Sequence, residues 1–307
     1  FTCEHCGDVH DDDSAISLES GGYVCEGCYS DNYFTCDNCG YVFHIDNSYD
    51  DNGNIVCESC YEGNSEDIHD YHHKPVPVFH KTEGEGKCRK YGVELETEGD
   101  SDFAGELLEM SDDENLFWLE HDSSLNHGFE IVTHPCSLVY HQKEFPWKNI
   151  TAYLREHGFK SHDTTTCGLH IHVSRKGLTA TDQIKIGLFV GFNYAKLKVF
   201  GRRDYNHYCK QKQIEKGKLK DVVYSPDRYE AVNFTNRNTI EFRFFKGTIK
   251  LDTIIASIEF VDALCAYVKQ NGFPTINRPC WTEFVAFCQK DKTYKTLVSY
   301  MDHRNLL

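Results

Sequence analysis

The sequence predicts an α+β protein preceded by a small cysteine-rich module. Two observations carry this prediction. Eight of the fifteen cysteines fall in four C-x2-C pairs within the first 60 residues, a pattern typical of metal binding rather than of disulfides. After about residue 90, short segments rich in branched and aromatic residues are interleaved with longer segments of helical periodicity. With 307 residues, the chain is long enough for one large domain and a small one.

The cysteine-rich module is a tandem repeat. The motif F-T-C-x2-C-G occurs at residues 1–7 and again at 34–40, and V-C-E-x-C-Y occurs at 24–29 and again at 56–61. Because each repeat is self-contained, we predict that each holds one structural zinc ion in a closed tetrahedral site. The predicted zinc ligands are Cys3, Cys6, Cys25 and Cys28 in the first repeat and Cys36, Cys39, Cys57 and Cys60 in the second. The module resembles a zinc ribbon or a LIM-type pair, with a longer join between its halves than LIM domains have.

Charge is distributed as unevenly as cysteine. Residues 1–73 contain 17 acidic side chains and no lysine or arginine, which leaves 31 acidic against 32 basic side chains in the rest of the chain. Such a segment repels a phosphate backbone, so we exclude nucleic acid as a partner. Complementarity instead favours recruitment of a basic protein or peptide, the alternative being a solubilising appendage. No run of eighteen apolar residues suggests a membrane span, and the isolated thiols favour a reducing, cytoplasmic location.

The elements are predicted in chain order from local patterns. We place the zinc module at residues 1–62, a linker at 63–87 and the α+β domain at 88–307. Short runs of β-branched and aromatic residues predict strands, and apolar residues at helical spacing predict helices. The predicted strands are 91–97, 128–133, 167–174, 229–234 and 239–245, and the predicted helices are 148–157, 181–200, 251–270 and 281–289. Three linker histidines, His69, His72 and His73, could contact a metal, but we interpret this segment as solvated.

Three of the predicted strands separate charged from apolar residues. Because side chains alternate between the two faces of a strand, Glu94 and Glu96 share one face, as do His170 and His172 in the histidine strand. The strand at 239–245 repeats the pattern with Glu241. A solvated face would normally mix lysine, threonine and serine with glutamate, whereas these faces hold carboxylates and imidazoles. This combination of side chains favours a site in which divalent cations bind phosphate groups.

Four segments, in this order, resemble the signature of the putative amidoligase family. They read Y-G-V-E-L-E at residues 91–96, G-F-E-I-V-T-H-P at 128–135, T-C-G-L-H-I-H-V-S at 166–174 and N-T-I-E-F-R-F-F-K-G-T at 238–248. That family belongs with glutamine synthetase and gamma-glutamylcysteine synthetase among the carboxylate-amine ligases. The resemblance implies a glutamine synthetase-like antiparallel sheet with helices on one face. It covers about residues 88–250 and leaves the zinc repeats outside.

The resemblance also implies roles for individual residues. It implies magnesium ligands, which are Glu94, Glu96, Glu130, His170 and Glu241. It leaves a further acidic ligand in the region of Glu130 unassigned. Arg243, with Arg228 as a weaker candidate, would face the phosphate or the substrate carboxylate. Further candidates for nucleotide contacts are His172, Arg202, Arg203 and Lys246.

The implied reaction is ATP-dependent ligation of a carboxylate and an amine through an acyl phosphate. Two or three magnesium ions would bridge the ATP phosphates. The substrate would be a small molecule, a peptide or a protein side chain. Two alternatives remain open: a metal-dependent hydrolase, since H-x-H strands also occur in that class, and a non-catalytic adaptor that uses the zinc module for protein interaction.

Overall fold

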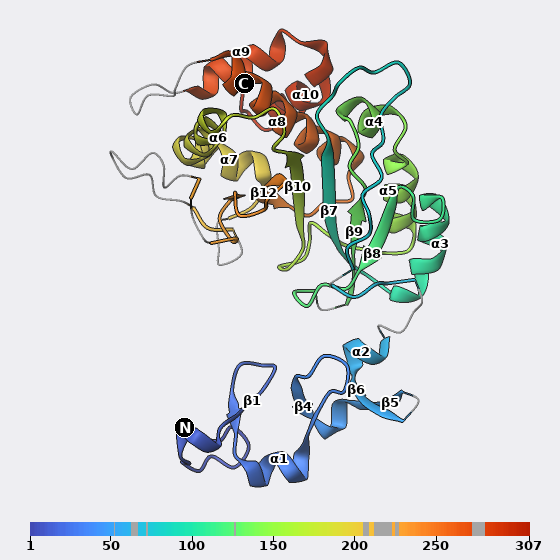
Figure 1. Ribbon diagram of the computed structural model, residues 1–307, viewed down its shortest axis with the longest axis vertical. Helices are drawn as coiled ribbons and strands as arrows, with labels where there is room; N and C mark the ends of the chain where they lie inside the picture. The colour runs from blue at the N-terminus through green and yellow to red at the C-terminus, as the bar shows by residue number, and fades with distance from the viewer. Residues whose placement is uncertain are drawn as a thin grey trace. The chain divides into compact units, whose positions relative to one another are not determined.

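The computed structural model describes residues 1–51, 53–62, 67–71, 73–125, 127–204, 209–211, 223–224, 227–271 and 280–307. The chain divides into two compact units, Phe1–Ile68 and His69–Leu307 (Figure 1). Residues 69–87, predicted as part of a linker, therefore group with the larger unit; His72 lies outside the described residues. No helix among the described residues has the length and apolar character needed to span a membrane.

The smaller unit consists of short hairpins and two short helices. Its elements are η1 (Asp12–Ser14), β1 (Ile16–Ser17), β2 (Tyr23–Val24), α1 (Glu26–Asn32), β3 (Tyr33–Thr35), β4 (Val42–His44), η2 (Ile45–Asn47), β5 (Ser48–Asp51), β6 (Asn54–Cys57) and α2 (Glu58–Glu62). The strands pair as β1–β2, β3–β4 and β5–β6. Two separate apolar clusters form, one around Cys3, Val24 and Cys25 and one around Phe34 and Val56. Each repeat thus has its own minimal core.

The larger unit is a mixed α+β structure. Its elements are β7 (Tyr91–Glu98), η3 (Ser101–Phe103), α3 (Ala104–Leu108), η4 (Glu109–Ser111), β8 (Phe117–Glu120), β9 (Gly128–Thr133), α4 (Leu138–Lys143), α5 (Trp147–Glu156), β10 (Gly168–Ser174), α6 (Ala180–Phe192), α7 (Tyr194–Gly201), β11 (Val232–Asn233), β12 (Thr239–Lys246), α8 (Leu251–Gln270), α9 (Cys280–Gln289), η6 (Lys292–Tyr294) and α10 (Lys295–His303). Its six strands form one sheet in the order β11-β12-β10-β7-β9-β8. Every neighbouring pair is antiparallel. The predicted α+β class is confirmed.

Helices cover one face of this sheet. Helix α8 packs against β10 and α7 packs against β12, while α4, α5, α6, α9 and α10 contact α8. The strand residues beneath them are apolar and buried, as with Leu95, Ile171 and Phe242. Helix α8 is buried along nearly its whole length, because it lies between the sheet and the other helices. The opposite face is left for polar side chains, as the alternation within the strands predicts.

Several predicted bounds differ from the structure. The helix predicted at 181–200 is two helices, because Asn193 interrupts it and donates from its side-chain amide to the carbonyl of Phe189. The strand predicted at 229–234 is reduced to β11, two residues long. Strand β8 and helices α4 and α10 were not predicted from the sequence.

Candidate functional site

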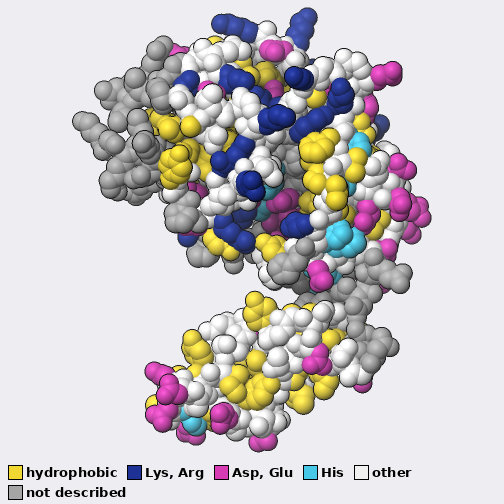
Figure 2. Space-filling model, viewed as in Figure 1, with side chains coloured by type: hydrophobic (Ala, Val, Ile, Leu, Met, Phe, Trp, Pro, Cys, Tyr) yellow, Lys and Arg dark blue, Asp and Glu magenta, His cyan; other side chains and the backbone are white. Residues whose placement is uncertain are grey.

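The polar face of the sheet gathers the charged residues of five strands. Antiparallel register places His170 of β10 opposite Glu94 of β7, and His172 opposite Glu241 of β12. Glu96 pairs with Glu130 of β9 across the next ladder. Because paired residues in antiparallel strands project to the same side, all these side chains share one face. Figure 2 shows acidic side chains at the bottom of a hollow in the larger unit, with lysine and arginine around its rim.

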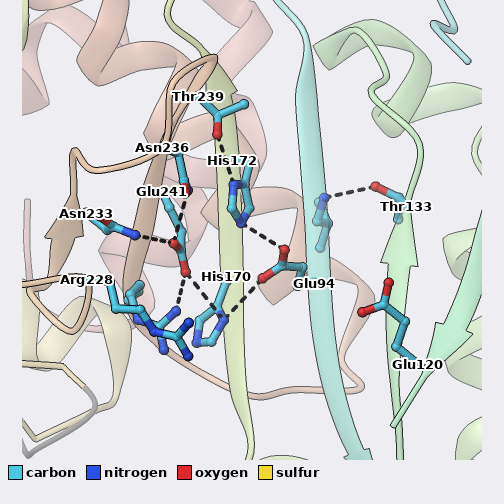
Figure 3. A network of polar contacts seen from close by, with 12 residues as sticks. Glu94, Glu120, Thr133, His170, His172, Arg228, Asn233, Asn236, Thr239 and Glu241 are labelled. Atoms are coloured by element: carbon cyan, nitrogen blue, oxygen red, sulfur yellow. Dashed lines mark hydrogen bonds and ion pairs between the residues drawn. The ribbon is translucent and has the colours of Figure 1, made fainter. Parts of the chain in front are cut away.

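Glu94, His170 and Glu241 form the centre of this face (Figure 3). His170 Nδ1 lies 3.5 Å from a Glu94 oxygen and 3.8 Å from a Glu241 oxygen. One ligand atom from each of the three residues lies within 4.8 Å of the others. His172 Nε2 lies 2.9 Å from the second Glu94 oxygen. Two imidazoles therefore share one carboxylate.

A second carboxylate group lies along the same face. Glu120 of β8 is paired with Glu130 of β9, which is paired in turn with Glu96 of β7. All three are almost fully buried, with exposed fractions of 2%, 5% and 4% in that order. Glu120 accepts from Trp118 Nε1 at 2.6 Å, and Lys74 Nζ lies 3.4 Å from it. Three adjacent buried carboxylates are unfavourable unless a cation or protons neutralise them.

The electrostatics divides the five carboxylates into two groups. Burial raises the pKa of Glu94, but His172 and His170 outweigh it and hold this pKa well below its usual range. Glu241 behaves in the same way, with His172 overcoming the effect of burial on its pKa. In the other group, burial and the neighbouring acids raise the pKa of Glu130 well above its ordinary value. Burial also raises the pKa of Glu96 and of Glu120.

His172 interacts electrostatically with the first group, Glu94 and Glu241. Burial lowers its pKa, but the Glu94 and Glu241 carboxylates outweigh this effect and raise it to about 9. Its Nδ1 atom also contacts Thr239 Oγ1 at 3.2 Å. The histidine is thus fixed between β7 and β12 with its charge matched to the acids around it.

Arginines approach the acidic face from β12 and from the loops beside it. Arg243 Nη1 donates to Glu241, whose other oxygen accepts from Asn233 Nδ2 at 2.8 Å. Arg243 and Arg228 both lie over the ring of Tyr229, at 5.8 and 5.0 Å from its centroid. These contacts with Tyr229 bring Arg243 and Arg228 close together.

Gly168 allows Arg203 to reach the same face. Its backbone N–H donates to a Glu96 oxygen. A Cβ atom at this position would lie 2.7 Å from Arg203 Nη1 and 2.9 Å from His170 Nε2. Only glycine therefore permits the close approach of guanidinium, imidazole and backbone.

The guanidinium of Arg202 and the position of Lys246 complete the candidate set. Arg202, which ends α7 in the left-handed region with a φ of 59°, donates to the carbonyls of Lys246 and Gly247, so its guanidinium is tied to backbone. Lys246 is paired with Gly168 at the end of β12. Arg203 Nη1 also donates to backbone carbonyls, those of Arg243 and Phe245, but it lies beside Gly168 at the acidic face.

Sequence reasoning missed Glu120 and Asn233. Glu120 ends the apolar run Phe117–Glu120, which is strand β8. It lies opposite Glu130, in the region where the family resemblance leaves an acid unassigned. The sequence feature that could have indicated Glu120 is an acidic residue at the end of a short aromatic run, shortly before the strand that contains Glu130. Asn233 lies in β11, directly opposite Glu241, and no sequence motif marks it.

The donor set of the acidic face fits hard divalent cations. Carboxylate oxygens dominate, with one central imidazole, and His170 Nε2 is buried without a hydrogen-bond partner among the described residues. It lies 3.7 Å from Glu96 Oε1. The residues that would hold such ions are Glu94, His170 and Glu241 at one position, and Glu96, Glu120 and Glu130 at another.

The eight repeat cysteines form two tetrads in the smaller unit. One sulfur from each of Cys3, Cys6, Cys25 and Cys28 lies within 4.8 Å of the others, and the same holds for Cys36, Cys39, Cys57 and Cys60. The backbone N–H of Cys25 donates to Cys3 Sγ at 3.4 Å, and that of Cys57 to Cys36 Sγ at 3.3 Å. Backbone N–H groups lower the pKa of Cys3 to about 6, whereas burial and the neighbouring thiols raise the pKa of Cys28. The pairing within each repeat is as predicted from the spacing.

The solved structures that are similar to this chain include the following two. One, described as apo GmaS without ligand, matches with a TM-score of 0.39 and 11% identity over 71% of this chain and 68% of that chain. The other is the complex between the prokaryotic ubiquitin-like protein Pup and its ligase PafA. It matches with a TM-score of 0.33 and 12% identity over 71% of this chain and 59% of that chain, so this chain spans less than two thirds of its length. No family model and no curated protein matches the chain.

Proposed function

We propose that the larger unit is an ATP-dependent carboxylate-amine ligase of the amidoligase type. The observation that supports this proposal most strongly is the acidic face itself. Five carboxylates and two histidines from five strands converge there, three of the acids are buried side by side, and arginines stand at the edge. Bound magnesium would neutralise the acids and the polyphosphate together, which is the chemistry that phosphoryl transfer needs.

The side chains of this chain have distinct roles in the proposal. Glu94, Glu241 and His170 hold one cation position, and Glu96, Glu120 and Glu130 hold another. His172 fixes the orientation of Glu94 through their 2.9 Å contact. Arg243, Arg228 and Arg203 supply positive charge that stabilises the phosphoryl group as it moves. Lys246 stays a candidate for nucleotide contact.

The reaction follows in two steps. A substrate carboxylate oxygen attacks the γ-phosphorus of ATP, which forms an acyl phosphate and releases ADP. An amine then attacks the acyl carbon, expels inorganic phosphate and loses a proton, which leaves an amide. A covalent bond to the protein is not required, so none of the isolated cysteines has a role in this scheme.

A defined experiment tests the ligase proposal. ADP and phosphate release is measured with magnesium over pools of amino acids and peptides, and condensed products are identified by mass spectrometry. We expect turnover that needs both a carboxylate and an amine and that is abolished in Glu94→Ala. Glu156→Gln, an exposed position of α5, is the control and should retain full activity. ATP hydrolysis without condensation would favour the hydrolase alternative, and failure to bind nucleotide would favour the adaptor.

We further propose that the smaller unit carries two structural zinc ions and recruits a basic protein or peptide. Its support is the cysteine geometry together with 17 acidic and no basic side chains in residues 1–73. Attraction of this kind weakens as salt screens it. Removal of residues 1–68 should therefore raise the KM for a basic peptide substrate at low salt and leave it unchanged at high salt. An unchanged KM at both salt concentrations would contradict recruitment.

A further inference from the structure

The segment after the unit boundary runs along the edge strand β8. The backbone N–H of His69 donates to the carbonyl of Leu119 at 2.8 Å, and the N–H of His121 donates to the carbonyl of His69 at 2.9 Å. A turn follows, closed by a 2.9 Å bond from the His73 N–H to the Asp70 carbonyl. This turn brings two histidines that are four residues apart back onto one another.

The two imidazoles are stacked face to face. Their ring centroids lie 3.7 Å apart and the rings are inclined by only 4°. Glu114, in the turn that precedes β8, approaches the pair, and its Oε1 lies 2.7 Å from His69 Nε2. One nitrogen of each histidine and one oxygen of Glu114 lie within 4.8 Å of one another. All three side chains are partly buried.

One atom of this cluster is unsatisfied. His73 Nε2 is buried and has no hydrogen-bond partner among the residues that the structure describes. An unpaired buried polar atom is unfavourable because it has lost its contact with water without gaining a partner. Protonation of both rings would place two positive charges in contact, whereas a metal ion would use both lone pairs and the carboxylate at once.

We propose that His69, His73 and Glu114 bind one divalent transition-metal ion of the zinc class, separate from the acidic face and from the cysteine tetrads. Two imidazole nitrogens and one carboxylate oxygen suit Zn²⁺, Co²⁺ or Ni²⁺, whereas Mg²⁺ prefers oxygen ligands. Three protein ligands leave a fourth position for water. The ion would take the place of the direct 2.7 Å contact between His69 Nε2 and Glu114 Oε1.

The position of the ion gives it a structural consequence. Between the two histidines, the Tyr71 hydroxyl accepts from Arg228 Nη2 at 3.3 Å. Directly after them, Lys74 Nζ lies 3.4 Å from both Glu120 oxygens. The ion therefore fixes the segment that delivers these two side chains to the acidic face. Its absence should loosen the backbone bonds between His69 and its neighbours on β8.

Cobalt binding to the full chain tests this site. The cysteine tetrads are first loaded with zinc, and Co²⁺ is then titrated in excess Mg²⁺. We expect one further equivalent of Co²⁺ with weak visible absorption and no thiolate charge-transfer band. That equivalent should be lost in Glu114→Gln and in His73→Gln. His303→Gln, an exposed histidine that ends α10, is the matched control and should keep it.

Two readouts guard against variants that fail to fold. The His73 ring lies 6.1 Å from that of Trp118, so bound Co²⁺ should quench tryptophan fluorescence in the wild type. Hydrogen exchange at the amides of His69 and His121 should slow when Zn²⁺ is added to wild type and stay unchanged in Glu114→Gln. A wild-type chain that binds no additional Co²⁺, or variants that bind it as tightly as wild type, would overturn the proposal.

Discussion

His141 makes the stability of the larger unit dependent on pH. It lies in α4, and its Nε2 is 3.1 Å from the carbonyl oxygen of Tyr91, while its Nδ1 accepts from Trp147 Nε1 at 3.2 Å. A carbonyl can only accept and an indole N–H can only donate, so the neutral ring with its proton on Nε2 satisfies both partners. A second proton would point at the indole N–H. Burial, together with the nearby His80 and Lys90, lowers the pKa of His141 to about 4.

The magnitude follows from linkage. An unfolded chain binds a proton at His141 near pH 6.5, whereas the folded chain binds it near pH 4. Between these values the unfolded state holds more protons, so the free energy of unfolding falls as the pH falls. Each pKa unit corresponds to about 1.4 kcal/mol, so the full effect is about 3 kcal/mol, of which about 2 kcal/mol appears between pH 7 and pH 5.

Urea unfolding monitored by tryptophan fluorescence measures this effect. All three tryptophans, Trp118, Trp147 and Trp281, lie in the larger unit, so the signal follows that unit alone. The His141→Gln variant retains an acceptor and a donor but does not titrate. Wild type should lose about 2 kcal/mol more than His141→Gln between pH 7 and pH 5. Equal losses in the two proteins would refute the reasoning.

Three further substitutions probe the two units. Gly168→Ala places a Cβ atom 2.7 Å from a guanidinium nitrogen of the acidic face; ligase turnover should fall about 100-fold if the catalytic groups shift by about 1 Å. Gly86→Ala, which has open space around it, should retain wild-type turnover. Cys36→Ser should reduce the zinc content, measured by mass spectrometry, by one ion per chain, while Cys88→Ser leaves it unchanged; equal content would contradict the tetrad. Glu130→Gln should weaken magnesium binding in calorimetry yet raise the melting temperature of the metal-free chain at neutral pH, because the raised pKa of Glu130 makes folding less favourable there; a lower melting temperature would contradict this reasoning.

The polar and apolar faces of the sheet could be predicted because charged and apolar residues alternate within single strands. In the centre of β7, β10 and β12 two ionisable residues (Glu94 and Glu96, His170 and His172, Glu241 and Arg243) alternate with apolar ones, so the face could be assigned without a structure. Strand β8 lacks this signal. All four of its residues are buried, Glu120 included, so the short run reads as apolar with a terminal acid. The additional carboxylate was missed for that reason.

The placement of neighbouring arginines could not be read from the sequence. Arg202 and Arg203 are adjacent and both donate to carbonyls of β12, yet Arg202 binds at the end of the strand and Arg203 binds further in, beside Gly168. The difference arises where α7 ends with Arg202 in the left-handed region. That turn depends on the packing of α7 against β12, which no local pattern encodes.

The cysteine tetrads and the His69, His73 and Glu114 cluster also differ in how far they could be predicted from the sequence. The cysteine tetrads repeat a fixed spacing within about 26 residues, so their pairing follows from the chain itself. The pairing of His69 with Glu114 spans 45 residues and depends on a segment lying along the edge of the sheet. The sequence marks the two histidines as possible metal ligands, but it does not indicate that Glu114 lies next to them.

The most direct test of the central claim is to trap the acyl phosphate with hydroxylamine. Hydroxylamine replaces the unknown amine, so only carboxylate pools, ATP and magnesium are needed. The ligase account predicts hydroxamate formed in equal amount to ADP by wild type and by Glu156→Gln, and none by Glu94→Ala. ADP release that does not depend on a carboxylate, or hydroxamate that persists in Glu94→Ala, would contradict it.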